Sequence, residues 1–173
     1  SGRCRLISVG DHPAGILRSH TITPKGIFRA HSWTVIMKKL SLVDKGFLAS
    51  ENRETPMHVA SLGLYTLPEG VDEQEFLHGL AANVRNADAL LPPFGDRLRL
   101  GRLGLAGNAY WEPDGAMDMD YHVRHSALPK PGRYRELFNL TSRLHGTLLD
   151  RSRPLWEMHL IEGLQNRQFA VYT

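Results

Sequence analysis

Two apolar segments near the C-terminal end of the chain constrain its fold most strongly. In residues 156–161 large apolar side chains alternate with Glu157 and His159, and residues 168–173 are again mostly apolar. Residues 163–167 between them contain a glycine and polar side chains, as turns do. This pattern predicts two strands joined in a hairpin, the first entered at Arg153 and Pro154. A strand ending at residue 173 leaves backbone groups to be paired, so we expect the natural chain to continue beyond it.

Helical periodicity elsewhere adds helices and predicts an α/β fold. Apolar side chains recur at helical spacing in residues 72–86 and 134–148, and Asp72 and Glu75 have the spacing of a capping box. Ser41 is a typical cap for a short helix through residue 49. Further strands are expected: a buried one at residues 57–67, short ones around a glycine-containing turn at 97–111, and a half-exposed one at 117–125.

The first 36 residues differ from the rest of the chain. Glycines and prolines interrupt them, whereas the sequence from Met37 onward is orderly and reads like a natural start. We expect residues 1–36 to be an expression tail or an upstream extension, the alternative being an irregular N-terminal arm. This segment holds five of the 21 basic residues and one of the 18 acidic ones. The remaining 16 basic and 17 acidic side chains give no reason to expect nucleic-acid binding.

Composition excludes several other classes of protein. With 42% hydrophobic and 23% charged residues the chain belongs among globular proteins. Its single cysteine, Cys4, excludes an internal disulfide and multi-cysteine metal sites. No apolar run approaches the roughly 20 residues of a membrane-spanning helix, so we expect any membrane contact to be peripheral.

Nine histidines raise the question of a metal site. His122 and His125 are three residues apart, which on a strand places them on opposite faces. A solvated strand face therefore explains this pair better than a shared metal, and we predict no metal site.

Three other histidines have a structural interpretation, and two of them also have a functional one. His145, near the end of a predicted helix, complements the helix dipole. His159 lies on the same strand face as Glu157 and is either a general base or a cross-strand partner. His58 either lines a pocket or is an interior, hydrogen-bonded side chain.

Motifs for nucleophilic catalysis and phosphate binding are missing from the sequence. It has no Gly-x-Ser-x-Gly segment, and the glycines at 101 and 104 lack the lysine and hydroxyl of a phosphate-binding loop. Arg97 and Arg99 could present charge to an anionic ligand such as a nucleotide phosphate, but a solvated hairpin is the favoured interpretation. The residues alone predict an α/β domain without a complete active site.

Three segments stand out for their order and spacing. Pro-Met-His-Val occupies residues 56–59, following Lys-Lys-Leu-Ser-Leu-Val-Asp at 38–44; Asp-Tyr-His-Val-Arg-His-Ser-Ala-Leu-Pro occupies 120–129; and Leu-Asp-Arg-Ser-Arg-Pro-Leu-Trp-Glu-Met-His-Leu-Ile-Glu-Gly-Leu occupies 149–164. Together they closely resemble the N-terminal domain of bacterial wax ester synthase/diacylglycerol acyltransferases, over residues 37–173.

The resemblance implies a fold and a chemistry. The fold is the N-terminal half of a two-half acyltransferase, like chloramphenicol acetyltransferases and condensation domains, with a mixed sheet flanked by helices (α/β or α+β). The activity is acyl-CoA-dependent O-acyl transfer, with acyl-CoA as substrate and no cofactor, forming wax esters from long-chain fatty alcohols and triacylglycerols from diacylglycerol. The family's general base is the second histidine of a His-His-x-x-x-Asp-Gly motif, which these 173 residues lack. The resemblance places it shortly after Thr173, in the C-terminal remainder of the enzyme or in a separate chain.

The resemblance also implies site residues. Pro154, Leu155 and Trp156 match a family signature near the catalytic centre. We expect Leu155, Trp156, Met57 and His58 to bind substrate, with Leu155 or Trp156 shaping the acyl or alcohol channel. The alternative is that Trp156 is a core aromatic residue and Pro154 merely starts the strand.

Two other functions remain as alternatives. One is a condensation-type acyltransferase that depends on a carrier protein, and the other is a non-catalytic module that binds lipid surfaces. In each case we expect a cytoplasmic protein, peripherally associated with the inner membrane face or with lipid droplets, and no nucleic-acid partner.

Overall fold

The computed structural model describes residues 37–87 and 90–173, so the predicted extension at residues 1–36 lies outside the described residues. The helices and strands of the described part follow one another in this order: β1 (Lys38–Lys39), α1 (Leu42–Ser50), β2 (Leu62–Thr66), α2 (Glu73–Arg85), β3 (Asp96–Gly101), β4 (Gly104–Pro113), α3 (Met119–His122), β5 (Val123–Ala127), α4 (Tyr134–His145), β6 (Met158–Glu162) and β7 (Gln168–Tyr172).

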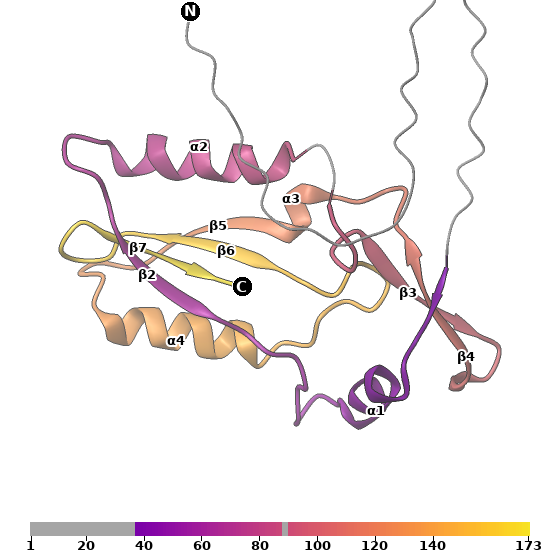
Figure 1. Ribbon diagram of the computed structural model, residues 1–173. Coiled ribbons are helices and arrows are strands. Elements are labelled where there is room, and N and C mark those ends of the chain that lie inside the picture. Colours follow the sequence, from indigo (N-terminus) through magenta and orange to yellow (C-terminus); the bar gives the residue numbers. More distant parts are fainter. Residues whose placement is uncertain (1–36, 88–89) are drawn as a thin grey trace, which may run out of the picture. The chain divides into compact units, whose positions relative to one another are not determined.

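The larger sheet is mixed. Its strand order is β2-β7-β6-β5, in which β5 and β6 are parallel and the other pairs are antiparallel. Helices α2 and α4 lie on opposite sides of this sheet (Figure 1). The predicted mixed α/β class, the two long helices and the hairpin of the last two strands are thereby confirmed.

Apolar periodicity explains how each helix covers its face. On one face α2 buries Ala81 against Val123 and Leu160. On the other, Leu137 of α4 is fully buried against Ile161 and other residues of the opposite face. The Asp72 side chain accepts a hydrogen bond from the backbone N–H of Glu75, which fixes the start of α2 as the sequence predicts.

A smaller antiparallel sheet, in the order β1-β4-β3, packs with α1 around Leu40, Leu48, Leu98 and Ala109. Leu155, from the loop before β6, packs against this cluster, and Pro154 forms an isolated bridge with Arg97. The loop therefore joins the two sheets. The predicted strands around a glycine turn at residues 97–111 are confirmed as the β3–β4 hairpin.

Two predicted strands are wrong in part. The expected buried strand at 57–67 is shorter, from Leu62 to Thr66, and mostly exposed, because it lies at the sheet edge and, among the described strands, pairs with β7 alone. The expected half-exposed strand at 117–125 begins as the helical turn α3, because the Asp118 side chain caps the backbone N–H of Tyr121. His122 in that turn is completely buried, not solvated.

The start of β6 also differs from the prediction. Pro154 does not open the strand, which begins at Met158. The backbone N–H of Trp156 donates to the Pro154 carbonyl, and the Trp156 carbonyl contacts His122 Nδ1 at 2.7 Å. These backbone groups are therefore not free for a strand partner.

Two glycines are expected to respond in opposite ways to alanine. A Cβ on Gly132 would collide with the carbonyl oxygen of Gly163, and its φ of +73° disfavours an L side chain. Gly132→Ala should lower the free energy of unfolding by roughly 1–3 kcal/mol. Gly46 lies in α1 with nothing within 4 Å of its would-be Cβ, so Gly46→Ala should raise it by about 0.5–1 kcal/mol. Urea unfolding of both variants checks this; an undiminished stability of Gly132→Ala contradicts the packing described.

Candidate functional site

A cavity of about 1110 Å³ brings together segments that are far apart in the sequence. Its walls come from α1, residues 57–61, the C-terminal end of α4, the loop before β6 and the ends of β6 and β7, with single residues from α2, β4, α3 and β5. Most of the wall is apolar, including Phe47, Leu48, Met57, Val59, Val84, Leu90, Phe94, Leu144, Leu148, Leu155, Trp156 and Met158. A space of this size and character suits an alkyl chain.

Trp156 forms part of this wall and is held in place from two sides. Its indole stacks on the ring of His122 with the centroids 4.6 Å apart, and meets Phe94 edge-on at 6.0 Å. The indole N–H donates to the Phe94 carbonyl at 2.8 Å. The side chain is therefore fixed in orientation while it faces the cavity.

One polar cluster of the cavity is centred on Glu157. His159 Nε2 lies 3.1 Å from one carboxylate oxygen, and Arg124 donates to the other at 3.3 Å. Hydrogen bonding with His159, supported by the charge of Arg124, holds the pKa of Glu157 below its usual range against the opposing effect of burial. Tyr121 lies under the Arg124 guanidinium, 4.6 Å from its ring centroid, and burial followed by the nearby Glu157 charge raises its pKa. The cluster thus keeps an ionised carboxylate within an apolar cavity.

A second polar cluster is centred on Glu51, whose side chain is 8% exposed. Arg151 donates to its carboxylate at 3.0 Å and to the Leu48 carbonyl at 2.7 Å. His58 lies 3.8 Å from the same carboxylate and meets the ring of His145 edge-on. This cluster fixes α1 against the loop before β6 and contributes Glu51 and His58 to the lining of the cavity.

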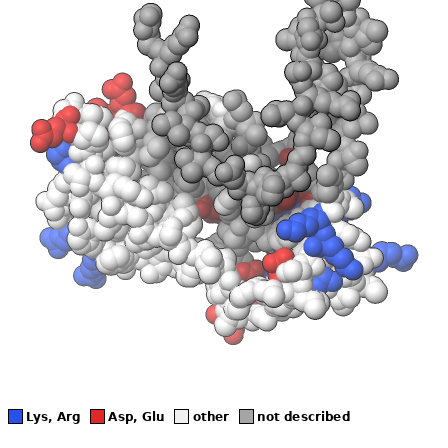
Figure 2. Space-filling view, in the orientation of Figure 1, with Lys and Arg blue, Asp and Glu red and all other residues white. Residues whose placement is uncertain are grey.

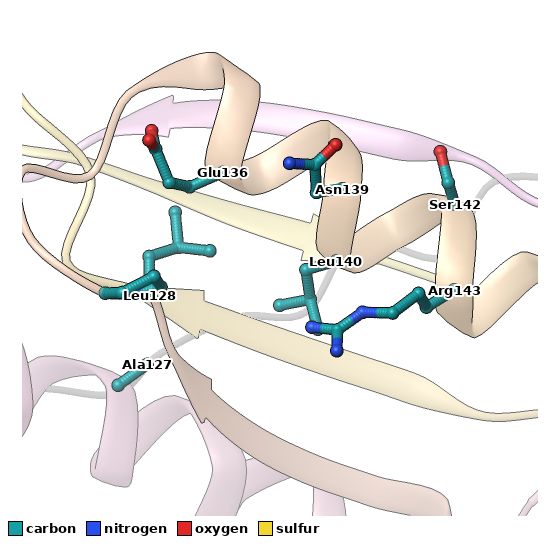
Figure 3. A pocket seen from close by; sticks show the side chains of 8 residues that line it. Ala127, Leu128, Glu136, Asn139, Leu140, Ser142 and Arg143 are labelled. Atoms are coloured by element: carbon teal, nitrogen blue, oxygen red, sulfur yellow. The ribbon is translucent and has the colours of Figure 1, made fainter.

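Another depression, of about 590 Å³, lies between α4 and the end of β5. Its polar side chains Glu136, Asn139, Ser142 and Arg143 all come from α4, and Leu128 follows β5 (Figure 3). It contains none of the residues that the sequence predicts to bind substrate. We therefore place the functional site in the larger cavity.

Basic side chains gather over the β3–β4 hairpin (Figure 2). Arg97 and Arg99 both contact the carboxylate of Glu112, at 2.9 and 2.8 Å. Their charges are therefore partly neutralised within the sheet, which favours the structural interpretation of this pair over an anion site.

The histidines considered as metal ligands do not meet. His122 stacks on Trp156, whereas His125 lies 3.1 Å from Glu162 on the α2 side of the sheet. Within residues 37–87 and 90–173, no group of three or more His, Cys, Asp or Glu side chains is placed to hold a metal ion.

The family model described as "Wax ester synthase/diacylglycerol acyltransferase catalytic domain" matches residues 40–173. The chain belongs to this family. The resemblance of the three sequence segments is thereby confirmed.

Individual members of the wax ester synthase/diacylglycerol acyltransferase family show the same relationship. A probable diacylglycerol O-acyltransferase of Mycobacterium tuberculosis is 49% identical over 133 residues, which are 75% of this chain and 28% of that protein. The O-acyltransferase WSD of Acinetobacter baylyi is 40% identical over 137 residues, 79% of this chain and 28% of that protein. The solved wax ester synthase/diacylglycerol acyltransferase from Marinobacter aquaeolei VT8 superposes with a TM-score of 0.70 at 44% identity, covering 79% of this chain and 32% of that one. The chain thus spans less than a third of the length of these relatives.

The structure places all four predicted substrate-binding residues on one cavity. Met57, His58, Leu155 and Trp156 all line it. Pro154 is buried behind them, at the bridge to Arg97. The arrangement supports both interpretations of Trp156, since its stacking and hydrogen bond are structural while its ring also faces the cavity. A role in binding substrate stays a prediction.

Sequence reasoning missed most of the polar cavity groups. Tyr121 and Arg124 reach Glu157 only because β5 pairs in parallel with β6 across a gap of more than 30 residues. Glu157 directly precedes β6 and His159 lies within it, and their alternation with apolar residues was visible in the sequence. His145, expected at a helix end, is the last residue of α4, with Nδ1 at 3.1 Å from the Tyr172 hydroxyl.

The Glu157 charge is expected to influence two tyrosines. Burial and, after it, Glu157 raise the pKa of both Tyr121 and Tyr172. Glu157→Gln should therefore lower both pKa values. Because the folded state favours the neutral phenols, the stabilisation they contribute is complete below pH 10 and is lost as the pH rises through the raised values. An NMR titration of tyrosines labelled at Cζ measures the shifts.

Glu162→Gln, on the other side of the sheet, is the control for this experiment and should leave the pKa values of both tyrosines as they are. If Glu157→Gln does not lower the two tyrosine pKa values, the arrangement described is contradicted.

Proposed function

We propose that this chain is the N-terminal part of an acyl-CoA-dependent O-acyltransferase that forms wax esters from long-chain fatty alcohols and triacylglycerols from diacylglycerol. Family membership and the large apolar cavity support this proposal. The observation that carries it is the convergence of Met57, His58, Leu155 and Trp156, from two distant family segments, on that cavity.

The reaction needs a general base, and these residues lack the histidine motif that carries the base in this family. The acceptor oxygen attacks the thioester carbonyl, the carbon–sulfur bond breaks, and coenzyme A leaves as the thiol with the proton of the hydroxyl. An alcohol requires a positioned base for this step. Because no His-His-x-x-x-Asp-Gly motif occurs in these 173 residues, we assign the base to the remainder of the enzyme. No cofactor takes part, and the partners are acyl-CoA, the acceptor and that remainder.

The proposal includes a peripheral position at the inner membrane face or at lipid droplets. Among the residues described, no helix has both the length and the apolar character to cross a membrane. The β3–β4 hairpin presents the exposed apolar side chains Leu100 and Leu103 beside the exposed Arg102, a combination suited to a lipid surface with anionic headgroups.

Release of free coenzyme A tests the activity. The full-length protein that contains this chain is incubated with a long-chain acyl-CoA and either a fatty alcohol or a diacylglycerol. We expect thiol release that depends on the acceptor, with ester product detected by mass spectrometry. Turnover only with an acyl group on a carrier protein would indicate a condensation-type enzyme. Sedimentation with lipid droplets without turnover would indicate a lipid-binding module.

A further inference from the structure

We propose that His122 is a positioning residue, which fixes the Trp156 indole in the wall of the large cavity and thereby sets how wide a hydrocarbon chain the cavity accepts. The inference rests on the proposed acyltransferase function and names a residue that determines its substrate selectivity. His122 acts through Trp156 and not on the substrate, because it is completely buried and is not part of the cavity lining.

The His122 side chain holds the backbone of Trp156. The Trp156 N–H donates to the Pro154 carbonyl at 2.9 Å, which closes a tight turn before β6. The Trp156 carbonyl lies 2.7 Å from His122 Nδ1, and since a carbonyl oxygen only accepts hydrogen bonds, Nδ1 is the donor. This bond also holds the imidazole itself in place, so that its ring stays beside Trp156.

The His122 ring supports the Trp156 side chain from behind. The two rings are stacked, with their centroids 4.6 Å apart and 22° between their planes. The indole lines the cavity and the imidazole does not, so the imidazole covers the indole on the side away from the cavity. The indole N–H is bound to the Phe94 carbonyl at 2.8 Å, but a ring fixed at this nitrogen and at Cβ can still turn about the line between them. The imidazole blocks that rotation in one direction.

Removing the support is expected to widen the cavity. Protein interiors are closely packed, and a side chain next to an empty space tends to move into it. In His122→Ala a space opens behind the indole, which can then turn away from the cavity and leave more room beside Leu155. One extra methyl or methylene group in an apolar pocket changes kcat/KM by roughly 10–200-fold, so a small displacement of this wall is measurable.

Steady-state kinetics on the full-length protein that contains this chain test the inference. The substrates are 1-dodecanol, a set of dodecanols with one methyl branch at successive carbons, and the corresponding acyl-CoAs. We expect His122→Ala to raise kcat/KM for at least one branched substrate about tenfold relative to its straight-chain parent. The series in which this occurs, alcohols or acyl-CoAs, identifies the chain that contacts the wall. His122→Phe keeps a ring behind the indole, so its selectivity should lie closer to that of the unmodified protein than to that of His122→Ala.

His125→Ala is the matched control. His125 lies in the adjoining strand β5, but its ring meets that of His78 in α2 and its Nε2 lies 3.1 Å from Glu162. Its loss removes a histidine ring from the same part of the chain without touching Trp156, and should leave the relative kcat/KM values unchanged. His122→Asn serves if His122→Ala does not fold. It removes the ring but retains an amide donor, and should change the selectivity in the same direction as His122→Ala.

The outcomes separate this inference from the proposed function. If no branched substrate gains on its parent in the folded His122 variants that lack a ring, or if His125→Ala gives the same gain, the inference is overturned while the acyltransferase remains. If the unmodified protein releases no coenzyme A, the proposed function fails. Equilibrium dialysis with the same alcohols and acyl-CoAs then decides the inference. His122→Ala must bind at least one branched compound about tenfold more tightly, relative to its parent, than the unmodified protein does, and equal ratios would overturn it.

Discussion

Replacing Trp156 with alanine is expected to lower the free energy of unfolding by about 3 kcal/mol and acyl transfer at least about tenfold. The substitution removes the stacking on His122, the contact with Phe94 and the hydrogen bond to the Phe94 carbonyl. It also opens the wall of the cavity beside Leu155. Urea unfolding and coenzyme A release, measured on the same preparation, give both effects.

Trp156→Phe separates the two roles of the side chain. Phenylalanine keeps an aromatic ring beside His122 but loses the indole N–H, so we expect a cost of about 1 kcal/mol. If this variant retains most of the transfer activity, the ring itself forms the functional wall. Full activity of Trp156→Ala in a folded protein would show that the residue is only structural.

The second large effect is expected at Arg151. Arg151→Met leaves the Glu51 carboxylate, 8% exposed, without its cation, and removes the bond to the Leu48 carbonyl. Removing the cation that pairs with a buried carboxylate should lower the free energy of unfolding by about 3 kcal/mol. The measurement is urea unfolding.

Arg153 offers a matched control in the same loop. Its side chain is 36% exposed, against 35% for Arg151, but its partners Asp118 and Asp150 are 51% and 44% exposed. Arg153→Met should therefore cost no more than about 1 kcal/mol. Adding Glu51→Gln to Arg151→Met should recover part of the loss, because the unpaired charge disappears. Equal costs for the two arginines would contradict the importance assigned to the burial of Glu51.

The fold could be predicted where periodicity and local capping agree. Helices α2 and α4 and the β6–β7 hairpin show this, since their apolar faces match the core that they form. The predictions failed where a side chain or a distant partner takes up a backbone group. The Asp118 side chain caps a helical turn, α3, at the start of a predicted strand. His122 contacts the carbonyl oxygen of Trp156, so this group does not pair with a strand and β6 begins only at Met158.

The site was predictable only in part, and for a related reason. Family resemblance identified Met57, His58, Leu155 and Trp156, which the structure brings to one cavity. The polar groups around Glu157 depend on the parallel pairing of β5 with β6, for which no local pattern in the sequence gives a signal. The contact between the Glu157 carboxylate and Arg124 of β5 can be found only from the three-dimensional arrangement.

Photolabelling tests most directly whether the cavity binds the substrate chains. The full-length protein is irradiated with a long-chain alcohol that carries a diazirine, and the labelled peptides are sequenced by mass spectrometry. We predict labels within residues 57–61 and 155–159, both of which are suppressed by an excess of unlabelled alcohol. Labels confined to the α4 depression at residues 127–143 or to the β3–β4 hairpin, with residues 57–61 and 155–159 free of label, would contradict the assignment of the cavity.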